Sequence, residues 1–287
     1  MSGSSEKTAF VFAGGGSLGA VEVGMLRELL AYGERADVVV GASAGAINGA
    51  YFAGRPDADG VAALAALWGQ LRRRDIMPMT MLGLFNMILR RRQHLVEASA
   101  LRALLVRHLP FSRLEDASLP LHVVATDLLS GDEVVLGQGP AVDAVLASAA
   151  IPGVFPPVEL NGHMLVDGGV ANNTPVSVAV KLGARRVIVL PAGFACALQQ
   201  PPRSVIAQAM HALTLLIARQ LVNDIRAYAP QAAIHVIPPL CPLNTSPYDY
   251  SQCGRLIELA AERTRQWLRD GGLETPTLPS SLLEHHH

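Results

Sequence analysis

The residues best suited to chemistry lie in a Gly-x-Ser-x-Gly pattern formed by Gly41, Ser43 and Gly45. Three valines at 38–40 precede it, and small residues that suit a helix follow it. This order predicts a buried strand, a sharp turn with Ser43 at its apex, and a helix that begins just after the serine. Glycine on either side leaves room for so tight a turn. A serine held there, beside the N–H groups of a helix N-terminus, is suited to nucleophilic acyl transfer.

A glycine-rich loop at residues 13–20 follows a short apolar run at 8–12, which we expect to be a buried strand. Backbone N–H groups in such a loop can bind an anion. One interpretation is an oxyanion hole, in which the N–H groups of Gly15, Gly16 and Ser17 face the alkoxide that forms during acyl transfer. The alternative of a passive turn is less favoured, because three adjacent glycines lose much chain entropy on ordering.

Glycines 14, 16 and 19 also satisfy the Gly-x-Gly-x-x-Gly pattern of a dinucleotide site. That site requires an acidic residue at the end of the second strand to hold a ribose. The nearest acids, Glu34 and Asp37, precede the second strand, whose end carries the serine pattern instead. The order of the residues therefore favours acyl transfer over nucleotide binding.

A third glycine-anchored motif is Asp167-Gly168-Gly169. The pair Asn161-Gly162 predicts a hairpin turn, after which a strand over 164–166 carries Asp167 to the edge of the sheet. A turn aspartate is one interpretation. The other is an acid–base partner for the serine, because both residues end a strand and meet a glycine. The preceding segment 151–158 is apolar and stiffened by prolines, and it could form one wall of a pocket.

Three histidines, His163, His211 and His235, could complete a Ser-His-Asp triad, although no local pattern marks any of them. Asp127 also ends a predicted strand, and we expect it to cap the following turn.

The three cysteines, Cys196, Cys241 and Cys253, lack the spacing of a metal site. Their odd number and the lack of a signal peptide predict reduced thiols in a cytoplasmic protein.

The elements that must position these motifs alternate between strands and helices, which predicts a mainly parallel sheet covered on both faces. With 287 residues, 50% of them hydrophobic and 16% charged, the chain can bury one large α/β core. We expect a flexible N-terminus over 1–6, one domain over 7–272, and a tail over 273–287 that ends in the remnant of a purification tag.

A net charge of −1 indicates no affinity for nucleic acid, and no apolar run reaches the roughly 18 residues needed to cross a bilayer.

The segment 72–92 is unusual, because arginine triplets at 72–74 and 90–92 bracket an apolar, methionine-rich run. Such a segment suits a lid or a peripheral contact with a membrane. Core packing or an oligomer contact together remain the favoured interpretation for a run of this length.

Taken in order, the glycine-rich loop, the serine pattern and Asp167-Gly168-Gly169 resemble the patatin-like phospholipase family. The resemblance extends to Ala147-Ser148 and the proline loop at 151–158, and it covers roughly residues 8–265. It implies a three-layer α/β/α fold and a serine hydrolase of lipid esters that needs neither metal nor nucleotide. Many members carry a basic residue where this chain has Leu18, a departure that bears on substrate preference.

The resemblance also implies roles for residues. Ser43 is the expected nucleophile and Asp167 the expected general base, in a dyad without histidine. The expected oxyanion hole is the loop of Gly14, Gly15, Gly16, Ser17 and Gly19. Two rivals remain: an α/β-hydrolase with a Ser-His-Asp triad, and a module on the same fold that binds a lipid or nucleotide without turnover.

Overall fold

The computed structural model describes residues 6–76, 96–193, 205–241, 245–276, 278–279 and 282. Most of the segment 72–92 and all of the predicted tag remnant therefore lie outside the described residues. Within the described part of the chain, an eight-stranded sheet runs in the order β5-β6-β3-β2-β1-β7-β8, and β4 pairs with β3. The strands are β1 (Thr8–Phe12), β2 (Val38–Ala42), β3 (Leu121–Asp127), β4 (Glu133–Leu136), β5 (Val158–Leu160), β6 (His163–Asp167), β7 (Arg186–Leu190) and β8 (Ala233–Val236).

The middle of the sheet is parallel: β3, β2, β1, β7 and β8 all run the same way, whereas β4, β5 and β6 are antiparallel to their neighbours. Every residue of β1 and β2 is buried, as expected for central strands covered on both faces. Alternate residues of β1 enter different cores. Phe10 and Phe12 face one helical layer, and Ala9 and Val11 face the other.

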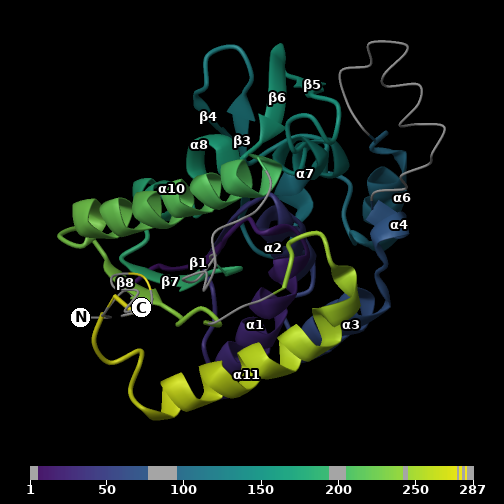
Figure 1. Cartoon of the computed structure of the whole chain (residues 1–287). Helices are drawn as coiled ribbons and strands as arrows, with labels where there is room; N and C mark the ends of the chain where they lie inside the picture. The colour runs from purple at the N-terminus through teal and green to yellow at the C-terminus, as the bar shows by residue number, and fades with distance from the viewer. Residues whose placement is uncertain are drawn as a thin grey trace.

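Figure 1 shows the two layers of helices. The larger core lies beneath α1 (Ala20–Tyr32), α2 (Ala44–Gly54), α3 (Ala58–Gln70), α6 (Ser99–His108), α7 (Ala141–Ser148) and α11 (Cys253–Arg269). On the opposite face, α9 (Val176–Lys181) and α10 (Val205–Tyr228) cover the smaller core. Shorter helices are α4 (Arg73–Ile76), α8 (Gly169–Asn172) and three 3₁₀ turns at Gly16–Gly19, Leu114–Asp116 and Tyr250–Gln252. The expected α/β fold with a helix-covered sheet is confirmed.

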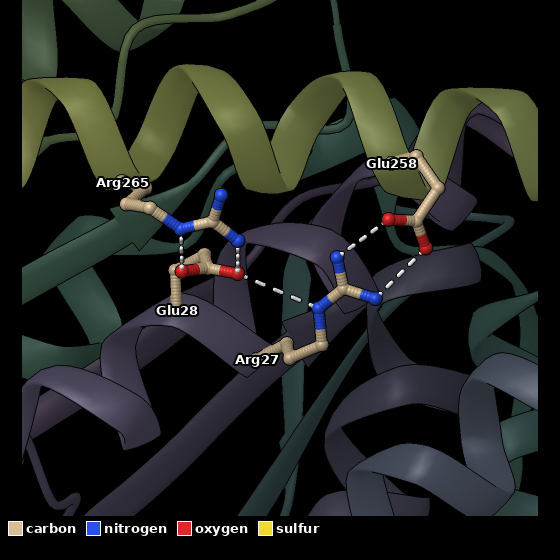
Figure 2. Close-up of polar contacts among 4 residues, drawn as sticks. All are labelled: Arg27, Glu28, Glu258 and Arg265. Carbon is tan, nitrogen blue, oxygen red and sulfur yellow. Dashed lines mark hydrogen bonds and ion pairs between the residues drawn. The ribbon is translucent and has the colours of Figure 1, made fainter.

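Helices α1 and α11 pack side by side although they are far apart in the sequence (Figure 1). A Cβ atom at Gly24 would lie 2.2 Å from the carbonyl oxygen of Ile257, so only glycine permits this close approach. Figure 2 shows the charged rim of the contact. Two pairs of hydrogen bonds join Arg27 to Glu258 and Arg265 to Glu28, at 2.8–2.9 Å. The pair of Arg27 and Glu258 is exposed and contributes little stability, whereas Glu28 is buried beneath Arg265. The close approach at Gly24 and the bond between Arg265 and Glu28 therefore both help to hold α11 in place.

The cysteines differ from the expectation of three reduced thiols. Cys241 is disulfide-bonded, whereas Cys253 is a buried free thiol at the start of α11. Among the described residues, no helix combines the length and the apolar character needed to cross a bilayer.

Candidate active site

The turn between β2 and α2 places Ser43 as the sequence predicts. Its backbone has φ 54° and ψ −124°, a conformation that residues other than glycine rarely adopt. The flanking glycines make the turn sterically possible. A Cβ atom at Gly41 would lie 2.5 Å from the carbonyl oxygen of Gly45, and one at Gly45 would lie 2.4 Å from that of Phe12. The serine hydroxyl does not cap α2, so it is free to point elsewhere.

The hydroxyl of Ser43 points at Asp167. Its Oγ atom donates a hydrogen bond to Oδ2 of Asp167 at 2.6 Å, across 124 residues of sequence. The topology explains the meeting, because β6 carries Asp167 alongside β3, which in turn pairs with β2. The second carboxyl oxygen, Oδ1, accepts the N–H of Gly169 at 2.7 Å. The aspartate is therefore fixed by its own glycine pair while its other oxygen faces the serine.

Burial changes the acidity of this aspartate. Loss of solvent raises the pKa of Asp167 to about 6, although the hydrogen bonds from Ser43 and Gly169 oppose the rise. Only 7% of the residue is exposed. A carboxylate with this pKa is ionised at neutral pH and is a stronger base than an ordinary aspartate. These are the properties that a general base for a hydroxyl requires.

The glycine-rich loop borders the same point, but not all of its N–H groups are available. That of Gly14 donates to the carbonyl of Asn173 at 2.9 Å, and that of Ser17 donates to the carbonyl of Pro247 at 2.8 Å. The N–H groups of Gly15 and Gly16 have no hydrogen-bond partner among the described residues. Of the five residues predicted for an oxyanion hole, these two carry N–H groups that a ligand can use. Gly19 does not line the cavity at Ser43, and its carbonyl oxygen accepts a hydrogen bond from the side chain of Asn48.

One residue at the site had no role in the sequence analysis. Asn173 lies between the two glycine motifs, since its Oδ1 atom would be 2.3 Å from a Cβ at Gly14 and 2.7 Å from one at Gly169. Its amide donates to the carbonyl of Gly14 at 3.2 Å. The backbone carbonyl of Asn173 also accepts the N–H of Gly14, so two hydrogen bonds hold the glycine-rich loop beside the segment that follows Asp167. Asn173 directly follows α8, and asparagine is so common at helix ends that its type alone gave no signal.

Among the described residues, no histidine contacts Ser43 or Asp167 through a side-chain hydrogen bond. His163 binds Asp127 through Nδ1 at 2.7 Å, and this hydrogen bond holds the pKa of Asp127 at about 2. Asp127 also accepts the N–H groups of Leu129 and Ser130, so it caps its turn as expected. Within the described part of the chain, no histidine borders the cavity at Ser43. The described residues also contain no group of three or more acidic, histidine or cysteine side chains placed to hold a metal.

A cavity of about 550 Å³, termed here the broad cavity, opens on Ser43 and Asp167. Its size lies in the range of small-molecule sites. The lining is mostly apolar and comes from the glycine-rich loop, the proline loop, α8, α10 and the segment before α11; it includes Leu18, Ile151, Val170, Leu213, Ile217 and Tyr248. A cavity of about 600 Å³ over α11 is lined by Arg263, Arg265 and Arg269 and touches none of the predicted site residues.

Comparison with known proteins identifies relatives of this chain. The family model described as patatin-like phospholipase matches residues 10–180, which include the serine pattern and Asp167. The chain is 31% identical over 187 residues to patatin-like phospholipase domain-containing protein 7 of Rattus norvegicus, a match that covers 64% of this chain and 13% of that protein. It is 30% identical over 191 residues to the uncharacterized NTE family protein Mb1092c of Mycobacterium bovis, covering 65% and 49%. The matched part is therefore less than half the length of these relatives.

Among solved structures, VipD from Legionella pneumophila has a similar fold, with a TM-score of 0.50 and 16% sequence identity. The similarity covers 92% of this chain and 67% of that one.

Proposed function

This chain belongs to the patatin-like phospholipase family, and we propose that it is a serine acyl hydrolase that cleaves carboxylic esters of lipids. The activity is of the phospholipase A, lysophospholipase or esterase type. The observation that carries the proposal is the 2.6 Å hydrogen bond from the Oγ of Ser43 to the buried carboxyl of Asp167. The nucleophile and its base are thus already in contact, and the mostly apolar lining of the broad cavity suits a lipid.

In the first half of the proposed reaction, Asp167 takes the proton of the Ser43 hydroxyl as Oγ attacks the ester carbonyl carbon. The carbonyl oxygen becomes an alkoxide, which accepts hydrogen bonds from the N–H groups of Gly15 and Gly16. The bond from the carbonyl carbon to the alcohol oxygen then breaks. Asp167 returns the proton to the leaving alkoxide, and the acyl group remains as an ester on Ser43.

In the second half, water enters where the alcohol has left. Asp167 takes a proton from the water as its oxygen attacks the acyl-enzyme carbonyl, and the same two N–H groups stabilise the second alkoxide. When the bond to Oγ breaks, Asp167 returns the proton to Ser43. The products are a carboxylic acid and the regenerated dyad. Every proton in this scheme passes through groups of this chain or through water.

Hydrolysis of a phosphatidylcholine and of p-nitrophenyl esters by the wild type and by the Ser43→Ala and Asp167→Asn variants tests the proposal. We expect turnover by the wild type alone, with both variants folded. Folded wild-type protein that binds these lipids and cleaves none of the esters would instead identify a binding module.

A further inference from the structure

A second cavity also borders Ser43. It measures about 40 Å³, against about 550 Å³ for the broad cavity, and is termed here the narrow slot. Among the described residues its walls include Trp68, Ile76, Leu101, Ala149, Phe155 and Tyr250. These side chains are at most 7% exposed. The slot is therefore lined mainly by buried apolar side chains, and its small volume admits only a slender group.

The two cavities meet at Ser43 and share Gly16, Ile151, Pro247 and Tyr248. They differ in one respect that matters for the reaction. Asp167 lines the broad cavity and does not line the slot, whereas Ala44 and Ile47 of α2 line the slot alone. An ester bound at Ser43 has an acyl chain and an alcohol group on opposite sides of its carbonyl carbon, and the two cavities can hold one of them each.

The position of Asp167 indicates which cavity holds the acyl chain and which holds the alcohol. The leaving alkoxide must receive its proton from Asp167, and the water that replaces it must give a proton to the same carboxylate. The alcohol therefore leaves on the side of the broad cavity. We propose that the narrow slot holds the acyl chain and the broad cavity holds the alcohol. The substrate class is then an ester of a short, unbranched acyl chain with a bulky, largely apolar alcohol. This assignment rests on the proposed function and refines it.

The slot is held rigid by groups that the reaction does not use. The indole N–H of Trp68 donates to Oδ1 of Asn48 at 2.8 Å, and the ring stacks on Tyr250 with centroids 6.3 Å apart and planes 11° apart. The amide of Asn48 in turn donates to Oε2 of the fully buried Glu22 at 2.7 Å. Moving side chains that are fixed in this way to admit a longer acyl chain costs free energy, so the size of the slot selects the acyl length.

Esters that share the p-nitrophenyl leaving group and differ only in acyl length test the assignment. For the wild type, kcat/KM should rise by about fourfold for each methylene that the slot accepts and should fall once the slot is full. The Leu101→Ala variant removes about three carbons from the wall, so its maximum should move to longer chains. The Ala149→Leu variant adds carbons to the wall, so its maximum should move to shorter chains.

The matched control is Leu105→Ala. Leu105 lies one turn further along α6, is as buried as Leu101, and does not line the slot. This control should lose stability as Leu101→Ala does but keep the wild-type maximum. The assignment is overturned if neither slot variant moves the maximum, or if Leu213→Ala, in the broad cavity, moves it instead.

Failure of the assignment and failure of the proposed function have different signatures. If the folded wild type cleaves no ester and a fluorophosphonate does not label Ser43, the proposed function fails and the assignment fails with it. If the esters are cleaved but the slot variants keep the wild-type maximum, the assignment alone is wrong. Labelling rates with alkyl fluorophosphonates of increasing chain length provide the same comparison without turnover, since the alkyl group on phosphorus occupies the place of the acyl chain.

Discussion

The Oγ atom of Ser148 accepts a hydrogen bond from the backbone N–H of Ser43 at 2.9 Å. The same hydroxyl donates to the carbonyl of Val124 at 2.5 Å, and the carbonyl of Ser148 accepts the N–H of Gly168 at 3.1 Å. One fully buried residue at the end of α7 therefore holds the chain beside both Ser43 and Asp167. Because the φ of Ser43 is unfavourable for an L-residue, the turn depends on such contacts.

Replacing Ser148 by alanine should lower kcat much more than it changes KM. The substitution leaves the N–H of Ser43 buried without a partner, at a cost of about 1–3 kcal/mol in the free energy of unfolding. Steady-state kinetics and urea unfolding measure the two effects. Ser177→Ala is the control, because it removes another buried hydroxyl. That hydroxyl accepts a hydrogen bond from the side chain of Asn172 at 3.0 Å and has no bond to Ser43 or Asp167. An unchanged kcat in Ser148→Ala would show that the turn holds Ser43 without this bond.

The pH dependence of kcat/KM should follow the ionisation of Asp167. Since the base must be deprotonated, activity should rise with pH through about 6, the pKa that burial gives this carboxyl, and should then level off. A rate profile from pH 4 to 8 measures the rise. The His163→Ala variant should keep the same profile. If the rise disappears in this variant, a histidine and not Asp167 controls the rate.

Ionisation of Asp167 should also lower the free energy of unfolding. The native state holds the Asp167 proton more tightly than the unfolded chain, in which the pKa is near 3.8. This stabilising effect is fully present below pH 3.8 and is lost as pH rises through about 6. The difference between the two pKa values corresponds to about 3 kcal/mol. Asp167→Asn should therefore be more stable than the wild type at pH 8, by up to this amount, and similar to it at pH 4.

Thermal unfolding at the two pH values measures this difference, and Asp127→Asn is the matched control. The pKa of Asp127 is lowered by its bond to His163, so removing its charge should reduce stability at pH 8. Equal effects of the two substitutions would contradict the account.

Glu22 should tolerate glutamine but not alanine. Burial raises its pKa well above the ordinary value and so favours the neutral carboxyl, and an uncharged amide can still accept the bond from Asn48. Glu22→Gln should stay within about 1 kcal/mol of the wild type, whereas Glu22→Ala opens a cavity and should lose about 2–4 kcal/mol. Urea unfolding at pH 7 compares the three proteins. A loss in the glutamine variant as large as that in the alanine variant would mean that the carboxyl acts in its charged form.

Local patterns were enough to predict the turn at Ser43 and the strand that ends at Asp167. Both depend on short-range chemistry, because a valine run sets the strand and glycine relieves a crowded turn. That these two residues meet depends on β6 lying beside β3, which no short pattern specifies. The family resemblance supplied the pairing instead.

The rest of the site depends on contacts between distant segments. The N–H of Ser17 is occupied by Pro247, so the sequence could not show which N–H groups of the loop remain available. The narrow slot combines side chains from α3, α6 and the turn before α11, and each of these residues looks like ordinary core in its own segment. Apolar periodicity marks a residue as buried but does not distinguish a filled core from the wall of a cavity.

The rate at which a fluorophosphonate probe labels Ser43, followed by mass spectrometry of the labelled peptide, tests the Ser43–Asp167 dyad most directly. We expect the wild type and His163→Ala to label at similar rates, Asp167→Asn to label about 10²–10⁴-fold more slowly, and Ser43→Ala not to label. Fast labelling of Asp167→Asn together with loss of labelling in His163→Ala would contradict the dyad and would favour a histidine as the base.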